Sequence, residues 1–122
     1  MKKVVLSMSF AFIVASCTST IESSPYKPSA SEFDIKSAKR SLSKYDAVTV
    51  DDDGFIVVSH QIQSGYKWDK IGMRQYGYET ACEWLEWYID RGFIVNVWAK
   101  GRGGSYEFYN ADRCAEGPPT NL

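Results

Sequence analysis

The chain has 122 residues, a formal net charge of −1 and an aromatic content of 15%. This length suits one small domain, and neither an internal repeat nor a second domain boundary is visible. Acidic and basic side chains nearly balance, 15 against 14, so the chain lacks the strong basic field that binds nucleic acid.

The N-terminus has the pattern of an export signal. Met1-Lys2-Lys3 is a short basic head, and the residues from Val4 to Ala15 are apolar except for two serines. This run is too short to span a bilayer as a helix, which needs about 20 residues. It has the length of the apolar region of a secretory signal.

The apolar run ends in Val14-Ala15-Ser16-Cys17, which resembles a bacterial lipobox. The resemblance implies that residues 1–16 are a lipoprotein signal peptide and that Cys17 is acylated. Several fatty chains anchor a protein firmly, because each buried methylene contributes about 0.8 kcal/mol. Because Thr18, and not aspartate, follows the cysteine, the resemblance to lipoproteins also implies an outer-membrane location with the domain facing the periplasm. The alternative is an ordinary signal peptide with a chance cysteine.

The cysteine count fits this interpretation. Cleavage before Cys17 leaves 106 residues and removes two lysines, so 12 basic against 15 acidic side chains give a net charge of −3. In an oxidising compartment Cys82 can form a disulfide with Cys114. Closing this loop should raise the free energy of unfolding by roughly 3–4 kcal/mol. Two unpaired buried thiols are the alternative.

Composition divides the exported chain into three parts. Residues 17–30 contain the lipidated cysteine and a flexible tether rich in Ser, Thr and Pro. Residues 31–115 are expected to form a single α+β domain, and residues 116–122 a disordered tail.

Periodicity predicts the order helix, hairpin, helix, hairpin within the domain. A capping-box pattern opens a helix from Ser31 to about Lys44, and residues 79–91 have helical apolar spacing up to Gly92. Residues 63–78 are predicted to form a loop with at most one helical turn. Two turns join the expected strands, which are residues 46–50, 55–62, 93–99 and 105–110. We therefore expect a four-stranded antiparallel sheet with two helices and one disulfide.

Both faces of this sheet are expected to be apolar. One would carry Val48, Val50, Ile56, Val58, Phe93, Val95, Val97, Tyr106 and Phe108. An antiparallel sheet can leave one face exposed to solvent when that face is polar. Since the second face is apolar as well, it must be covered by the first helix or by a partner. Trp87, on the acidic side of its helix, is a further candidate anchor, although tryptophans in small domains are often core residues. The predicted partner-binding residues are Phe55, Val57, Trp87, Ile94, Trp98 and Tyr109.

No motif for catalysis, a cofactor or a metal is present. The single histidine, His60, lies mid-strand, where a structural role is the simpler interpretation. Three aspartates at 51–53 suggest calcium, but the further oxygen ligands that calcium needs do not follow at loop spacing. We expect a binding protein, not an enzyme, without cofactor or metal.

The lipobox, the tether, the order of elements and the pair Cys82 and Cys114 together resemble the lipoprotein pilotins of type II secretion systems, in particular the beta (AspS-like) class. The resemblance implies a non-catalytic protein that binds the C-terminal segment of a secretin subunit, which becomes helical on docking. The lipoprotein-sorting machinery then carries the pair to the outer membrane, where the secretin assembles. Only Cys17, Cys82 and Cys114 can be carried over by motif.

A periplasmic inhibitor or immunity lipoprotein that blocks an enzyme or toxin is the alternative function. Such proteins often insert a loop into an active site, so residues 63–78 would then carry the function.

Overall fold

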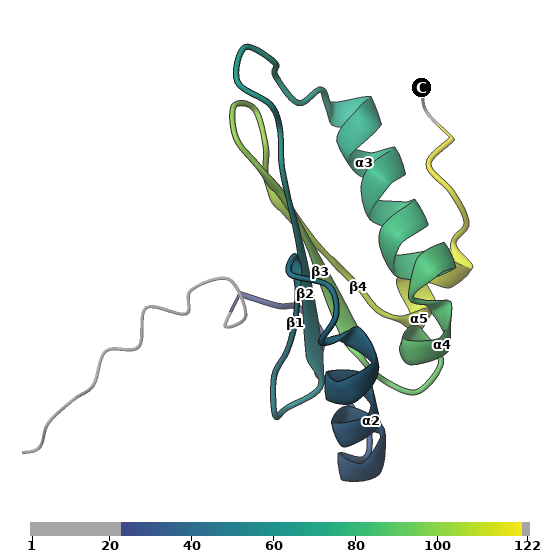
Figure 1. The fold of residues 1–122 in the computed structure, drawn as a ribbon. Coiled ribbons are helices and arrows are strands. Elements are labelled where there is room, and N and C mark those ends of the chain that lie inside the picture. Colours follow the sequence, from purple (N-terminus) through teal and green to yellow (C-terminus); the bar gives the residue numbers. More distant parts are fainter. Residues whose placement is uncertain (1–22, 121–122) are drawn as a thin grey trace, which may run out of the picture.

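A computed structural model describes residues 23–120, so the predicted signal peptide, residues 1–16, and Cys17 lie outside the described residues. Two β-hairpins form one four-stranded sheet of order β1-β2-β3-β4 (Figure 1). The pairs β1–β2 and β3–β4 are antiparallel, whereas β2 and β3 are parallel, with Phe55 opposite Ile94. The strands are β1 (Val48–Val50), β2 (Phe55–Gln61), β3 (Ile94–Lys100) and β4 (Tyr106–Tyr109).

The prediction of a wholly antiparallel sheet was therefore wrong, because the sheet is mixed. The cause is the connection between the hairpins. A helical return from the end of β2 to the start of β3 makes the two strands run in the same direction, as in a βαβ unit.

This return is a longer helical segment than the sequence predicted. It consists of α3 (Lys70–Tyr78), the π-helical turn η1 (Glu79–Trp84) and α4 (Glu86–Ile89), and it covers one face of the sheet (Figure 1). The expected loop over residues 63–78 is thus half helical. Its helix begins where the Asp69 side chain accepts a hydrogen bond from the Gly72 amide at 2.6 Å, an N-cap that satisfies a free helix donor.

The first helix confirms its predicted start. In α2 (Glu32–Leu42) the Ser31 hydroxyl accepts a hydrogen bond from the Asp34 amide at 3.1 Å. The expected apolar side of the helix is buried, at Ile35, Ala38 and Leu42.

The core lies between the sheet and the helical return. Its largest fully buried apolar side chains are Phe93, Ile56, Leu85, Ile89 and Val95. The predicted disulfide is confirmed: Cys82 of η1 is bonded to Cys114, with Cα atoms 5.4 Å apart. Cys114 belongs to α5 (Ala111–Ala115), a short helix that the sequence did not predict.

Residues 24–30, the last part of the predicted tether, lie against the sheet; we call them the strap. The Ser29 amide donates to the Gly92 carbonyl at 2.8 Å, and Ala30 packs against the main core. In residues 23–120 no helix is long and apolar enough to cross a membrane.

Candidate partner-binding face

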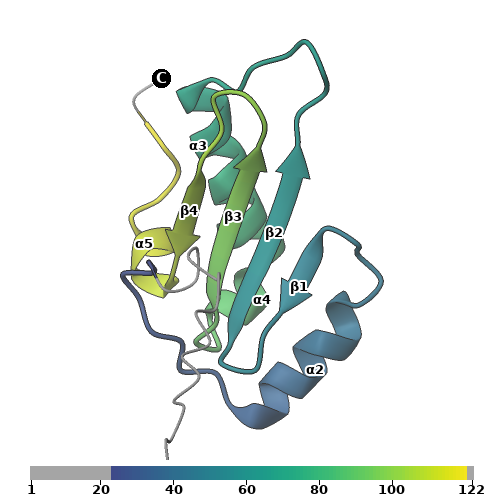
Figure 2. The same cartoon turned by 90° about the vertical axis from the view of Figure 1, so that its left-hand side faces the viewer.

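The sheet face opposite the helical return is the candidate site, and we call it the open face. Figure 2 shows it toward the viewer, with α3 and α4 behind the strands. Strand register places on it Thr49, Phe55, Val57, Ser59, Gln61, Ile94, Asn96, Trp98, Lys100, Tyr106 and Phe108.

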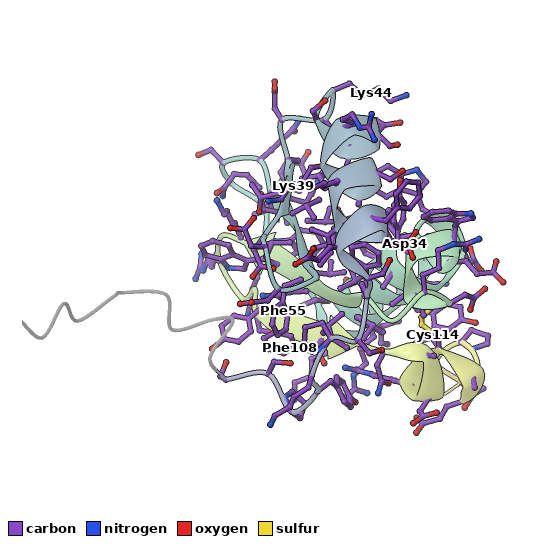
Figure 3. The ribbon with its side chains drawn as sticks, turned by 90° about the horizontal axis from the view of Figure 1, so that it is seen from below. Asp34, Lys39, Lys44, Phe55, Phe108 and Cys114 are labelled. Carbon is purple, nitrogen blue, oxygen red and sulfur yellow. A yellow bond between two sulfur atoms is a disulfide. The ribbon has the colours of Figure 1, made fainter. Side chains whose placement is uncertain are left out.

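One part of the open face is a small apolar cluster. Phe55, Ile94 and Phe108 are buried there, and the half-buried Tyr26 of the strap packs against them. Figure 3 shows Phe55 and Phe108 next to one another. The strap therefore covers this cluster, which would otherwise expose apolar side chains to water.

The rest of the open face presents aromatic rings to solvent. Trp98 is 37% exposed and Tyr106, directly opposite it, is 40% exposed. The Lys100 ammonium lies 4.3 Å from the centroid of the Trp98 ring, a distance at which a cation is attracted by the ring. Exposed aromatic residues beside an apolar cluster are typical of protein interfaces.

Asn96 is the most unusual residue of the open face. It is fully buried between Val57 and Phe108. Neither its amide nitrogen nor its amide oxygen has a hydrogen-bond partner in the part of the chain that the structure describes. An unpaired buried polar group costs about 1–3 kcal/mol, and sequence analysis missed it because an isolated asparagine within a strand carries no distinctive pattern.

Four of the six predicted partner-binding residues come together on the open face: Phe55, Val57, Ile94 and Trp98. Tyr109 does not, and its placement on this face was wrong. It lies on the helix side, almost fully buried and opposite Val95. Burial raises the pKa of its hydroxyl, while the nearby Arg113 guanidinium acts in the opposite direction.

The error arose from the register of the second hairpin. A turn confined to residues 101–104 would pair odd positions of β3 with even positions of β4. The Ala99 amide instead donates to the Ser105 carbonyl, and Trp98 pairs with Tyr106. A one-residue shift exchanges the two faces of a strand, so Tyr106 and Phe108 lie on the open face.

Trp87 belongs to a different surface. It lies on α4 and is 45% exposed. The Arg91 guanidinium stacks on it, 3.5 Å from the ring centroid, and the Tyr88 ring lies 4.9 Å away. The structure therefore separates Trp87 from the other predicted residues and places it on the helix side of the sheet.

The acidic turn and the histidine have structural partners. A single Asp51 carboxylate oxygen accepts hydrogen bonds from the amides of Asp53, Gly54 and Phe55, each at 2.9 Å. The His60 ring contacts the rings of Trp68 and Tyr76 at 5.7 and 5.3 Å. No group of three or more side chains suited to a metal occurs within residues 23–120.

Comparison of the chain with protein-family models, with curated proteins and with solved structures finds no match. No family assignment follows from them. The function is therefore inferred from the chemistry of the open face, namely its aromatic rings, its apolar cluster and one unpaired amide.

Proposed function

We propose that the chain is an outer-membrane lipoprotein pilotin. It binds the C-terminal segment of a type II secretion secretin, targets it to the outer membrane and promotes its assembly there. The open face is the observation that carries the proposal, because it offers an apolar cluster, two exposed aromatic rings and an unsatisfied amide on one rigid sheet. These are features of a surface that binds another polypeptide.

The sequence motifs supply the other half of the proposal. A lipid on Cys17 would anchor the complex to the membrane, and the lipoprotein-sorting machinery would recognise the lipidated N-terminus. The Cys82–Cys114 disulfide suits an oxidising compartment outside the cytosol. The domain itself needs no cofactor for this role.

Recovery of the partner from cells tests the proposal. Residues 18–122, which include every described residue, would be used as bait in an extract of the cell envelope, with mass spectrometry to identify bound proteins. We expect a secretin, and we expect a peptide from its C-terminal end to reproduce the binding.

Two tryptophan variants locate the binding surface. Trp98→Ala should weaken the peptide complex at least tenfold, because hot-spot aromatic residues contribute about 2 kcal/mol or more. Trp87→Ala removes a somewhat more exposed tryptophan on the other side of the sheet, 45% against 37%, and should leave the affinity unchanged. A large loss of melting temperature in Trp98→Ala would instead make Trp98 a core residue and contradict its assignment.

An inhibitor or immunity lipoprotein is the second candidate, and one feature favours it. The loop 62–69 and the turn 101–105 form a joint tip, where the Trp68 ring nitrogen donates to the Lys100 carbonyl at 2.8 Å. Tyr66 lies in this tip and is 65% exposed, and it lines a cavity of about 330 Å³. Replacing residues 63–67 with glycine and serine keeps Trp68. Loss of partner binding in this variant would favour the inhibitor, whereas retention would favour the pilotin.

A further inference from the structure

The strap holds Tyr26 in a defined position on the open face. The Ser24 hydroxyl donates to the Tyr26 carbonyl at 2.8 Å and accepts from the Tyr26 amide at 3.1 Å. This local turn presents the tyrosine ring to the cluster formed by Phe55, Ile94 and Phe108. The open face thus already binds one aromatic side chain from an irregular segment of polypeptide.

The two ends of the strap are attached differently. Ser29 is held by a backbone hydrogen bond to Gly92, and the adjacent Ala30 packs in the main core. Within residues 23–120, the hydrogen bonds of Ser24 and Tyr26 are to each other. Tyr26 can therefore leave the face without breaking any hydrogen bond to the sheet within residues 23–120.

The strap is also an incomplete ligand. Asn96 lies beside Phe108 on the same face, and its amide stays unpaired while Tyr26 is bound. An occupant that offered both a hydrogen-bond donor and an acceptor to this amide would remove the cost of leaving it unpaired.

We propose that the strap is a built-in competitor for the open face. The partner displaces Tyr26 by placing an aromatic or large apolar side chain against Phe55, Ile94 and Phe108, and it pairs an amide group with Asn96. Partner binding and release of the strap are then linked. The apparent affinity for the partner equals the affinity of the open form multiplied by the fraction of molecules in which the strap is open.

Release of the strap has a mechanical consequence, which rests on the proposed lipid anchor at Cys17. Freeing residues 24–27 adds four residues to the tether, or about 13 Å of reach at roughly 3.3 Å per residue. The domain with a bound partner would then stand farther from the membrane than the empty domain.

A peptide added in trans tests the strap without any assumption about the partner. The probe is the strap sequence itself, residues 23–30 as a blocked peptide, titrated into residues 18–122 and followed by NMR. We expect Tyr26→Ala protein to bind it at least tenfold more tightly than the wild type, with shifts at Phe55, Ile94 and Phe108. The same peptide with alanine in place of its tyrosine should not bind. Equal binding by both proteins would overturn the proposal.

Ser24→Ala provides a second, milder variant in case Tyr26→Ala fails to fold. It keeps the ring but removes the turn that positions it, so peptide binding should lie between that of the wild type and that of Tyr26→Ala. Binding no tighter than that of the wild type would contradict a role for the turn in closing the strap.

The secretin C-terminal peptide separates the strap proposal from the proposed function. If both hold, Tyr26→Ala should bind this peptide at least fivefold more tightly than the wild type. Binding of equal strength in the two proteins would overturn the competition and leave the pilotin function standing. No binding of the secretin peptide, together with binding of the strap peptide, would overturn the function and leave the competition standing.

Discussion

Replacing Asn96 with leucine should make the domain more stable and weaken its binding to a partner. Leucine has as many side-chain heavy atoms as asparagine, branches at the same carbon and has no polar atoms to leave unpaired. Asn96 is fully buried, and both its amide atoms lack partners within residues 23–120. Removing that penalty should raise the free energy of unfolding by about 1–3 kcal/mol.

Thermal unfolding of residues 18–122, monitored by circular dichroism with the disulfide intact, measures this gain. For a domain of this size each kcal/mol shifts the melting temperature by about 4–8 °C, so a rise of at least about 4 °C is expected. Asn110→Ala is the matched control, because the Asn110 side chain accepts a hydrogen bond from the Arg113 amide at 2.8 Å. Losing this helix cap should lower stability by about 1 kcal/mol.

The two asparagines should thus shift the melting temperature in opposite directions. A lower melting temperature in Asn96→Leu would refute the reasoning, because Asn96 would then have a stabilising partner. In the same variant the proposed amide contact with the partner is lost, which should weaken partner binding about 2- to 12-fold for a net hydrogen-bond contribution of about 0.5–1.5 kcal/mol.

Three further changes have defined outcomes. Replacing both Cys82 and Cys114 with serine opens a loop of sequence separation 32 and should cost about 3–4 kcal/mol in a urea titration; an unchanged midpoint would contradict the role of the disulfide. Gly92→Ala should destabilise by about 1–2 kcal/mol, because Gly92 has φ +90° and an added Cβ would collide with Ser29; unchanged stability would contradict both the positive φ and the close approach of Ser29. The pKa of Tyr109 is raised by burial, so above about pH 10 the unfolded state ionises first and stability falls. Tyr109→Phe should show a shallower fall in a series of unfolding curves from pH 8 to 11, and an identical fall would exclude this cause.

Local signals predicted the local structure well. The sequence predicted the Ser31 cap, the apolar side of α2 and the turn between β1 and β2, because each depends on residues within a few positions of one another. The disulfide was also predicted, since the expected export of the chain left two cysteines to form one pair. In each case a single short-range interaction or a simple count decides the outcome.

The predictions failed where an extra residue interrupts the helical spacing of apolar residues, or where strand pairing depends on contacts between distant parts of the sequence. In the π-helical turn the Leu85 amide donates to the Thr80 carbonyl, five positions earlier in the chain, at 3.1 Å. This insertion breaks the apolar spacing that would have joined α3 to α4. The parallel pairing of β2 with β3 depends on a helical return about twenty residues long, which local strand patterns do not contain.

The candidate site was only partly predictable for the same reason. Phe55, Val57, Ile94 and Trp98 share a face because alternation within a strand is a local rule. The register of β4 placed Tyr109 on the opposite face, and the position of Tyr26 follows from the folded path of the strap. Asn96 became a candidate only once its burial and its lack of partners were known.

Site-specific crosslinking in cells would identify the protein that contacts the open face. A photoreactive amino acid would replace Val57 on the open face or, as the control, Trp87 on α4 of the otherwise unchanged chain. We expect a light-dependent adduct with a secretin at position 57 and none at position 87. An adduct at position 87 alone, or capture of a hydrolase or toxin at position 57, would contradict it.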